Sequence, residues 1–256
     1  MKIKVLLFFV FWSNLIFSAE DKSEYLWFPS KPNIILLSYQ RSGNTWLRYC
    51  LEYLTKRPSL CNHLKNKINS PIGNIIGWEI DKSKSCIWKF HHERNLTAFG
   101  KSDPSRDLLI LLVRNYKECI PRQVKRKANR FNESVFYNLE KAYLSNISVY
   151  EKWNPSNRLM IYYEDLILNP YETLKSVLFF IKDSDVLLNE FIQNYLFHKK
   201  ESLKIYDVYE IPNKTKGDSI IFHSKFVSDA ILQKMDRVVM EKYPLFFRKY
   251  LHRYLN

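Results

Sequence analysis

The side chains best suited to chemistry are the small, polar and basic ones between Tyr39 and Trp46. Arg41 supplies a permanent positive charge, and Gly43 allows the backbone to approach a ligand closely. Three neighbours can cap a helix or donate hydrogen bonds to anion oxygens: Ser42, Asn44 and Thr45. This combination is typical of a site for a phosphate or sulfate group. An ordinary capped helix start is the alternative interpretation of the same residues.

Two further positions carry side chains of catalytic or anion-binding type. His91 is a candidate general base, because imidazole titrates near neutral pH. Arg114 is a candidate phosphate ligand, because a guanidinium group can donate two parallel hydrogen bonds to phosphate oxygens. His92 is adjacent to His91, but alternate residues of a strand face opposite sides, so we expect one of the two in a site. A surface or capping histidine is the alternative for His91.

Strand and helix signals alternate along the chain. Apolar runs predict four strands, at 33–38, 85–90, 108–113 and 159–163. Helical spacing predicts helices at 44–56, 117–130, 133–153 and 170–181, while the polar stretch 59–84 is expected to be a loop-rich insert. Such alternation is typical of an α/β fold with a central parallel sheet flanked by helices. Arg41, His91 and Arg114 each follow a predicted strand, so we expect them to converge at the carboxyl edge of that sheet.

Composition favours one large domain over residues 20–256. The chain has 256 residues, 46% hydrophobic content and only five glycines, which argues against disorder. A net charge of +14 favours anionic partners such as nucleotide phosphates, nucleic acid, acidic glycans or a membrane surface, without choosing among them.

Residues 1–19 differ from the rest, with a basic start followed by an apolar run. They are predicted to be a signal peptide or a short signal anchor that could tether the protein to a membrane, and a buried N-terminal element is the alternative. A location in the secretory pathway or at a membrane follows from that prediction. The four cysteines have no metal-binding spacing, and disulfides or buried thiols remain open for them: Cys50, Cys61, Cys86 and Cys119.

In chain order, these segments resemble the sulfotransferase family that uses 3′-phosphoadenosine 5′-phosphosulfate (PAPS). The stretch Tyr39–Trp46 resembles the family loop YPKSGTTW, and Lys89–His91 resembles its KxH element. Further on, the RNPKD-like, YEDL and closing-loop elements correspond to Arg114–Glu118, Tyr163–Leu166 and Thr215–Gly217. The resemblance spans roughly residues 33 to 225.

The resemblance implies a P-loop-NTPase-like sulfotransferase fold and transfer of a sulfuryl group from PAPS to a hydroxyl or amine, with no metal required. The acceptor would be a glycan, a phenol or a lipid, no specific nucleic acid partner is expected, and a eukaryotic protein would work in the Golgi lumen. His91 would be the base, and Arg41 would stabilise the leaving phosphate in place of the family lysine. The residues that would bind PAPS, with Arg41, are Ser42, Gly43, Asn44, Thr45, Trp46, Arg114, Arg122, Tyr163, Lys216 and Gly217.

By the same resemblance, the 5′-phosphate lies against Asn44 and Thr45, and the 3′-phosphate against Arg114. Arg122 stands where the family usually has a serine, and Pro121 is expected to interrupt the helix beside it. Trp46 and Tyr163 would contact adenine, with a core position as the alternative for Trp46. Lys216 and Gly217 would close over the 3′-phosphate.

Two other functions remain as alternatives. A P-loop phosphotransferase needs Gly-x-x-x-x-Gly-Lys-Ser/Thr, and the loop has neither that spacing nor the lysine. A non-catalytic secreted basic protein would bind polyanions through its charge. A chain that keeps the fold without activity is also open, since Gln40, Arg41, Asn44 and Arg122 depart from the family pattern.

Overall fold

The computed structural model describes residues 32–57, 59–61, 68–70, 73–75, 87–92, 96, 103–127, 133–205 and 228–255. Its strands are β1 (Ile34–Ser38), β2 (Ser59–Cys61), β3 (Ile68–Ser70), β4 (Gly73–Ile75), β5 (Ile87–Phe90), β6 (Leu108–Val113) and β7 (Arg158–Tyr162). Its longer helices are α1 (Asn44–Thr55), α3 (Tyr116–Lys127), α4 (Glu133–Lys152), α6 (Pro170–Phe180), α8 (Tyr195–Ile205) and α9 (Asp229–Lys242). Shorter helical segments are Pro155–Asn157, α5 (Tyr163–Leu168), α7 (Leu188–Gln193), α10 (Pro244–Phe246), Phe247–Leu251 and His252–Tyr254.

Five parallel strands form the central sheet, in the order β2-β5-β1-β6-β7. Leu36 of β1 lies opposite Lys89 of β5 on one side and Ile110 of β6 on the other. The predicted α/β architecture with a parallel sheet is therefore confirmed. The stretch 59–84 is not only loop, because β2 forms an edge of this sheet and β3 pairs antiparallel with β4.

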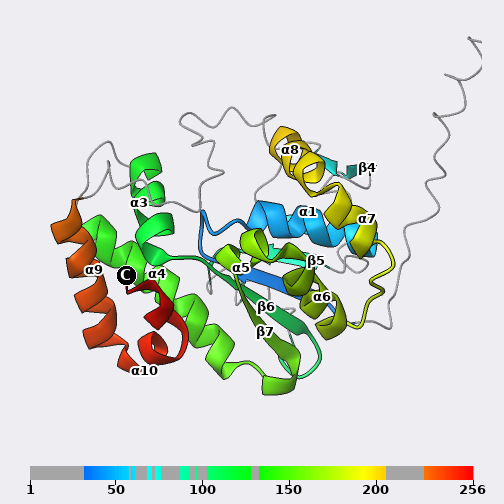
Figure 1. Ribbon diagram of the computed structural model, residues 1–256. Coiled ribbons are helices and arrows are strands. Elements are labelled where there is room, and N and C mark those ends of the chain that lie inside the picture. Colours follow the sequence, from blue (N-terminus) through cyan, green and yellow to red (C-terminus); the bar gives the residue numbers. More distant parts are fainter. Residues whose placement is uncertain are drawn as a thin grey trace, which may run out of the picture.

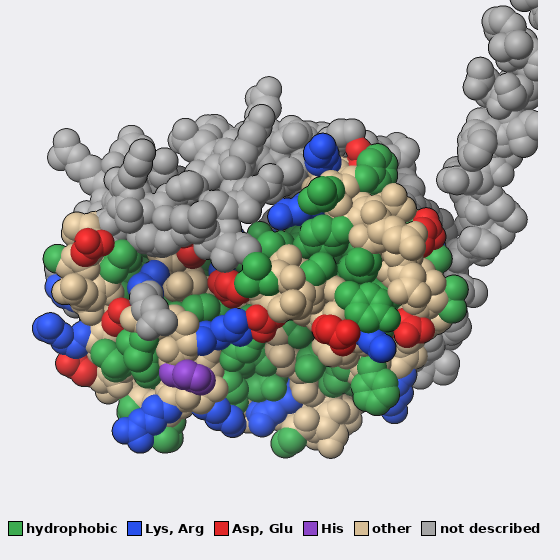
Figure 2. All heavy atoms as spheres, in the orientation of Figure 1, with side chains coloured by type: hydrophobic (Ala, Val, Ile, Leu, Met, Phe, Trp, Pro, Cys, Tyr) green, Lys and Arg blue, Asp and Glu red, His purple; other side chains and the backbone are tan. Residues whose placement is uncertain are grey.

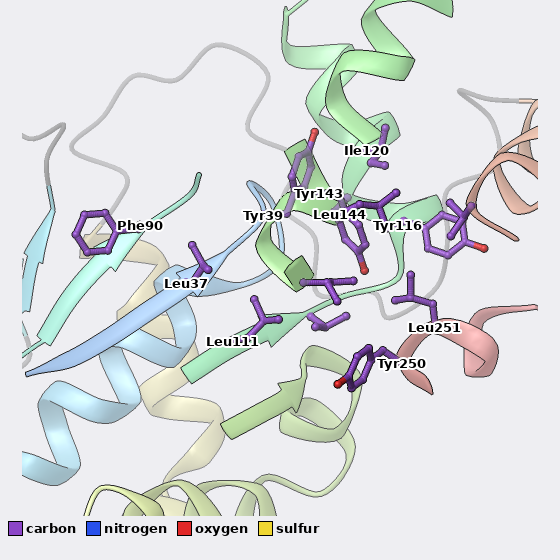
Figure 3. Close-up of a cluster of buried hydrophobic side chains, with 14 of the residues drawn as sticks. Leu37, Tyr39, Phe90, Leu111, Tyr116, Ile120, Tyr143, Leu144, Tyr250 and Leu251 are labelled. Atoms are coloured by element: carbon purple, nitrogen blue, oxygen red, sulfur yellow. The ribbon is translucent and has the colours of Figure 1, made fainter. Parts of the chain in front are cut away.

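Alternate residues of the strands pack into two separate hydrophobic clusters, one on each face of the sheet. Leu37 and Leu111 belong to the cluster covered by α3, α4, α9 and the C-terminal turns (Figure 3). Leu36 and Ile110 belong to the cluster covered by α1, α5, α6 and α7. Strands buried on both faces are continuous apolar runs, which is why β1 and β6 were readily predicted. The resulting three layers are visible in Figure 1.

Some boundaries differ from the sequence expectation. Pro121 does not interrupt its helix, since α3 runs from Tyr116 to Lys127 with Pro121 inside it. Tyr163 does not end a strand but begins α5.

Cys50 and Cys119 are buried free thiols, and burial raises the pKa of Cys119 to about 12, so it stays protonated at neutral pH.

Several predictions fall outside the described residues. They concern the signal segment 1–19, the closing loop Lys216–Gly217 and the cysteine Cys86. Among the residues that are described, no helix is both long and apolar enough to cross a membrane.

The two-faced core gives a direct stability test. Leu111 is 1% exposed, so Leu111→Ala should lower the free energy of unfolding by about 3 kcal/mol, through lost apolar contacts and the cavity left behind. Leu168→Ala removes the same atoms from a side chain that is 63% exposed and should change it by less than about 0.5 kcal/mol. Urea denaturation measures both, and equal losses would contradict the assigned packing.

Candidate functional site

The carboxyl ends of three neighbouring strands, β5, β1 and β6, bring the predicted site segments together. His91 follows β5 and its Nδ1 lies 3.2 Å from the main-chain carbonyl of Ser38, the last residue of β1. Arg114 follows β6 and its Nη1 donates to the main-chain carbonyl of Arg41 at 3.1 Å. The three segments that carry residues 41, 91 and 114 therefore meet at one edge of the sheet as expected, and Arg41 contacts Arg114 through its main chain.

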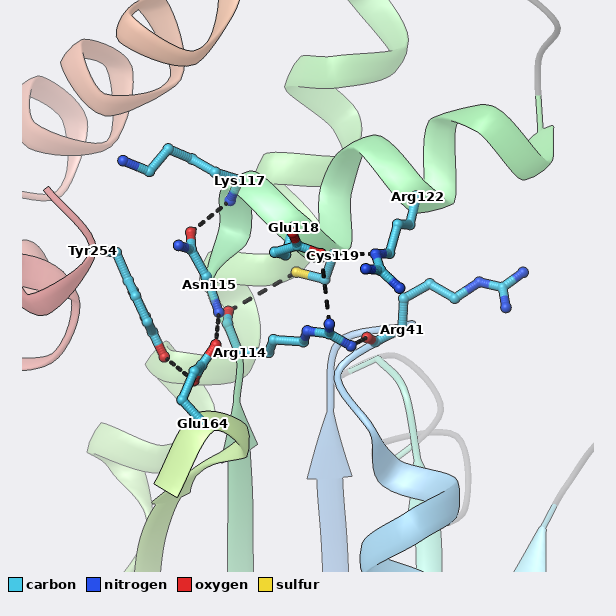
Figure 4. A network of polar contacts seen from close by, with 9 residues as sticks. All are labelled: Arg41, Arg114, Asn115, Lys117, Glu118, Cys119, Arg122, Glu164 and Tyr254. Atoms are coloured by element: carbon cyan, nitrogen blue, oxygen red, sulfur yellow. Dashed lines mark hydrogen bonds and ion pairs between the residues drawn. The ribbon is translucent and has the colours of Figure 1, made fainter. Parts of the chain in front are cut away.

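The loop after β1 has an unusual backbone. Arg41 adopts φ 70° and Gly43 φ 88°, both in the left-handed region, and the Ser42 amide donates to the Tyr39 carbonyl at 3.3 Å. A left-handed arginine costs roughly 1–2 kcal/mol, so surrounding contacts must hold it. Figure 4 shows one of them, the Arg114 guanidinium on the Arg41 carbonyl, while the Arg41 side chain extends away from Arg114.

The first turn of α1 is not capped by a side chain. Gly43 occupies the N-cap position, and its carbonyl accepts from the amides of Trp46 and Leu47. The alternative interpretation, an ordinary helix start capped by a side chain of Ser42, Asn44 or Thr45, is therefore not what the structure shows. Because the first N–H groups of a helix have no carbonyl within it to bind, this uncapped end suits an anion.

Asn44 and Ser42 face inward rather than toward a ligand. Asn44 Nδ2 donates to Ser38 Oγ at 2.8 Å, and the Asn44 side chain is buried. Ser42 is fully buried beside the Cys119 thiol, whereas Thr45 is half-buried. Of the three polar side chains predicted to contact phosphate, Thr45 is the most exposed.

Gly43 is required because the ring of Tyr163 lies against its backbone, whereas the sequence suggested that a ligand would approach there. A Cβ at position 43 would lie 2.2 Å and 2.3 Å from two ring carbons of Tyr163. The Arg114 guanidinium carbon in turn lies 4.2 Å from the centre of the Tyr163 ring. Tyr163 is 6% exposed, so its ring supports the loop and Arg114 together. Its predicted contact with adenine stays a prediction.

Arg114 lies in a dense network of polar contacts (Figure 4). Its Nη2 is 3.5 Å from Glu118 Oε2, and the same oxygen accepts from Arg122 Nε at 2.8 Å. The main-chain carbonyl of Arg114 accepts from the hydroxyl of Tyr143 at 2.8 Å. Arg114 and Arg122, both predicted phosphate ligands, therefore share one carboxylate.

Two acidic residues of the YEDL segment, Glu164 and Asp165, connect this region to neighbouring elements. Glu164 accepts from the Asn115 amide at 3.0 Å and from the Tyr254 hydroxyl at 2.8 Å. Asp165 receives two hydrogen bonds from Arg253, at 2.9 Å and 2.7 Å. These contacts fix the loop after β6 to α5 and to the C-terminal turns.

The environment of His91 decides which ring nitrogen carries its proton. A carbonyl oxygen only accepts, so Nδ1 must donate to Ser38, and the lone pair of the neutral ring belongs to Nε2. The buried Asn146 of α4 holds the backbone, because its Nδ2 donates to the His91 carbonyl at 3.3 Å.

His92 does not face away from the site. The strand ends at Phe90, so strand alternation does not extend to residues 91 and 92. The side-chain amide nitrogen of Gln40 lies 3.2 Å from Nε2 of His92 and donates to it. His91 thus contacts the last residue of β1 and His92 contacts the loop that follows it, so both histidines lie at this edge, contrary to the expectation that one would.

Trp46 lies in an aromatic cluster and is 5% exposed. Its ring stacks at 5.7 Å from Tyr49 and 5.9 Å from Phe191, with Tyr195 edge-on at 5.3 Å. The structure favours the core interpretation of Trp46 over adenine stacking. Lys216 and Gly217 lie outside the described residues.

Three residues that shape the site were not found from the sequence: Ser38, Glu118 and Asn146. Ser38 could have been suspected, because it is a polar residue at the end of the apolar run that forms β1. Glu118 lies four residues from each arginine, which a helical wheel would reveal. Nothing in the sequence pointed to Asn146, because it contacts His91 from a helix and lies 55 residues further along the chain.

Solved structures share this architecture, although no protein-family model and no curated protein matches the sequence. Mouse sulfotransferase SULT7A1, complexed with PAP, aligns over 87% of this chain and 87% of its own, with TM-score 0.50 and 19% identity. The sulfotransferase domain of the Synechococcus PCC 7002 olefin synthase aligns over 84% and 94%, with TM-score 0.50 and 18% identity.

The chain has a sulfotransferase fold. At these identities the likeness concerns the arrangement of the backbone alone. In this sulfotransferase fold, no group of three or more His, Cys, Asp or Glu side chains within the described ranges could hold a metal ion.

The contact between Gly43 and Tyr163 gives a second stability test. Gly43→Ala should lower the free energy of unfolding by about 3 kcal/mol, since it adds both a left-handed alanine and a clash with the ring. Relative to Tyr163→Ala alone, the same substitution should cost only about 1 kcal/mol, because the clash is gone. Urea denaturation of the four proteins measures this, and an unchanged cost would assign the whole effect to the backbone.

Proposed function

We propose that this protein transfers a sulfuryl group from PAPS to a hydroxyl or amine of an acceptor and releases adenosine 3′,5′-bisphosphate. One observation carries the proposal. A candidate base, an uncapped helix N-terminus and the Arg114 guanidinium, bound to the main chain of Arg41, lie at one sheet edge in a fold shared with sulfotransferases.

The anion-binding half rests on the loop after β1 and on Arg114. The first amides of α1 and the positive end of its dipole would bind the 5′-phosphosulfate, with Arg41 beside them. Negative charge grows on the leaving phosphate as the sulfur–oxygen bond breaks, so a fixed cation there lowers the barrier. Arg114, buried and held by Tyr163, would bind the 3′-phosphate.

The proton-transfer half rests on His91. Its Nδ1 donates to Ser38, so Nε2 would take the proton from the acceptor as the acceptor oxygen forms its bond to sulfur. PAPS supplies the activated sulfuryl group, and its bond to the 5′-phosphate breaks in the same displacement. Charges then balance, because the proton is on His91 and the negative charge is on the phosphate near Arg41.

The charges of the described residues do not favour the polyanion alternative. Lys117 is buried and its Nζ lies 3.3 Å from Asp236, while Arg114 and Arg122 pair with Glu118. These three cations, one before α3 and two within it, are therefore ion-paired rather than displayed to solvent. On the face shown in Figure 2, basic side chains are interspersed with acidic and hydrophobic ones rather than gathered into one patch.

The acceptor and the compartment are parts of the proposal that rest on the sequence. A glycan, a phenol or a lipid would supply the attacking hydroxyl. Residues 1–19 support a location in the secretory pathway or at a membrane, where PAPS must then be present.

Nucleotide binding tests the anion half. Calorimetry should show that adenosine 3′,5′-bisphosphate binds at least about tenfold more tightly than adenosine 5′-monophosphate, because only the bisphosphate reaches Arg114. Arg114→Gln should remove most of that preference, whereas Arg248→Gln, at an exposed position, should leave it unchanged. Equal affinity of the unsubstituted protein for both nucleotides would overturn the proposed function.

Sulfate transfer from labelled PAPS, first to a panel of phenol, glycan and lipid acceptors, tests the base. With an acceptor that the unsubstituted protein sulfates, His91→Ala should lower turnover by roughly a hundredfold and retain bisphosphate affinity, since only proton transfer is lost. His252→Ala removes an exposed histidine and serves as the matched control. Full turnover of His91→Ala would remove His91 from this role.

A further inference from the structure

Three charged side chains line one side of α3 and of the short segment that leads into it. Arg114, Glu118 and Arg122 are spaced four residues apart, so successive side chains meet on one helical face (Figure 4). Their side chains are only 5%, 3% and 12% exposed. A carboxylate thus lies between two guanidinium groups and largely out of water.

Arg122 has an unused donor within this cluster. The single oxygen Oε2 of Glu118 receives both arginines, at 3.5 Å and 2.8 Å. Arg122 Nη2 is buried and has no hydrogen-bond partner among the described residues. A buried guanidinium donor without an acceptor is costly, and an anion that reached Nη2 of Arg122 would remove that cost.

We propose that the Glu118 carboxylate is an internal counter-anion that competes with a phosphate monoester dianion for Arg122. The inference rests on the proposed function, and the phosphate is then the 3′-phosphate of the bound nucleotide. A phosphate offers three acceptor oxygens and nearly two negative charges, so it can satisfy Arg114 and the unpartnered Nη2 of Arg122 together. Arg122 is thereby a ligand that selects nucleotides with a 3′-phosphate.

Glu118 in turn sets the strength of that binding. Its negative charge stays within the cluster when the phosphate arrives, so it repels the ligand and gives up part of its own contact with Arg122. A purely structural role predicts the opposite sign, because an arginine released from its partner would lose its fixed position and bind phosphate less well. Neutralising Glu118 therefore separates the two roles by the direction of the change.

The experiment is calorimetry with adenosine 3′,5′-bisphosphate and adenosine 5′-monophosphate on four proteins: unsubstituted, Glu118→Gln, Arg122→Gln and the double variant. Glu118→Gln should tighten bisphosphate binding by about tenfold and change monophosphate binding by less than about twofold. Arg122→Gln should weaken bisphosphate binding by about tenfold, and in its background the gain from Glu118→Gln should fall below about threefold.

Asp236→Asn is the matched control, since it removes the same charge from an ion pair that α3 makes through Lys117. It should change bisphosphate affinity by less than about twofold, and cooperative thermal unfolding shows that each variant is folded. If Glu118→Gln does not fold, the Arg122→Gln result alone decides whether Arg122 binds the 3′-phosphate.

The outcomes separate this inference from the proposed function. If the unsubstituted protein prefers the bisphosphate but Glu118→Gln binds it equally or more weakly, Glu118 is not a competitor and the inference fails alone. Unchanged bisphosphate binding by Arg122→Gln would also overturn it. If the unsubstituted protein shows no preference for the bisphosphate, the proposed function fails and this inference fails with it.

Discussion

The structure depends on the hydrogen bond from Arg114 to the main-chain carbonyl of Arg41. It joins the ends of β1 and β6 and holds an arginine in a left-handed conformation that the backbone alone disfavours. Tyr163 supports both partners, because its ring lies against Gly43 and under the Arg114 guanidinium. The loop geometry is therefore set by residues from three separate segments rather than by the loop itself.

Arg114 also contributes to the charge balance of the site. Arg114 is used twice, as a structural donor to Arg41 and as a cation toward Glu118. Its planar fork allows this, because different N–H groups point in different directions. A lysine would offer no such fork, so this position requires arginine for geometric as well as electrostatic reasons.

The elements were predictable where a single physical signal dominates. Fully buried strands such as β6 are continuous apolar runs, and α1 shows a clear apolar stripe, so both were found close to their observed bounds. Pro121 was misjudged because α3 accommodates a proline inside its span. The strand β2 was missed because three residues in a polar stretch carry too little periodicity to register.

The site was predictable as a set of segments but not as a set of contacts. Strand ends in a parallel sheet must meet at one edge, which placed residues 41, 91 and 114 together. No local pattern could show that Trp46 packs with Phe191, or that Asn146 reaches His91, since both contacts join distant parts of the chain. The burial of Ser42 and Asn44 could not be seen in the sequence for the same reason, because it depends on the packing of distant segments.

Ser38 gives this arrangement a mechanical property. Its carbonyl accepts from His91 and its hydroxyl accepts from Asn44, so one residue at the tip of β1 is the common anchor of the candidate base and of the loop's helix. A shift of Ser38 would therefore move both groups in the same direction. The relative position of the candidate base and of the first residue of α1 depends on this single residue.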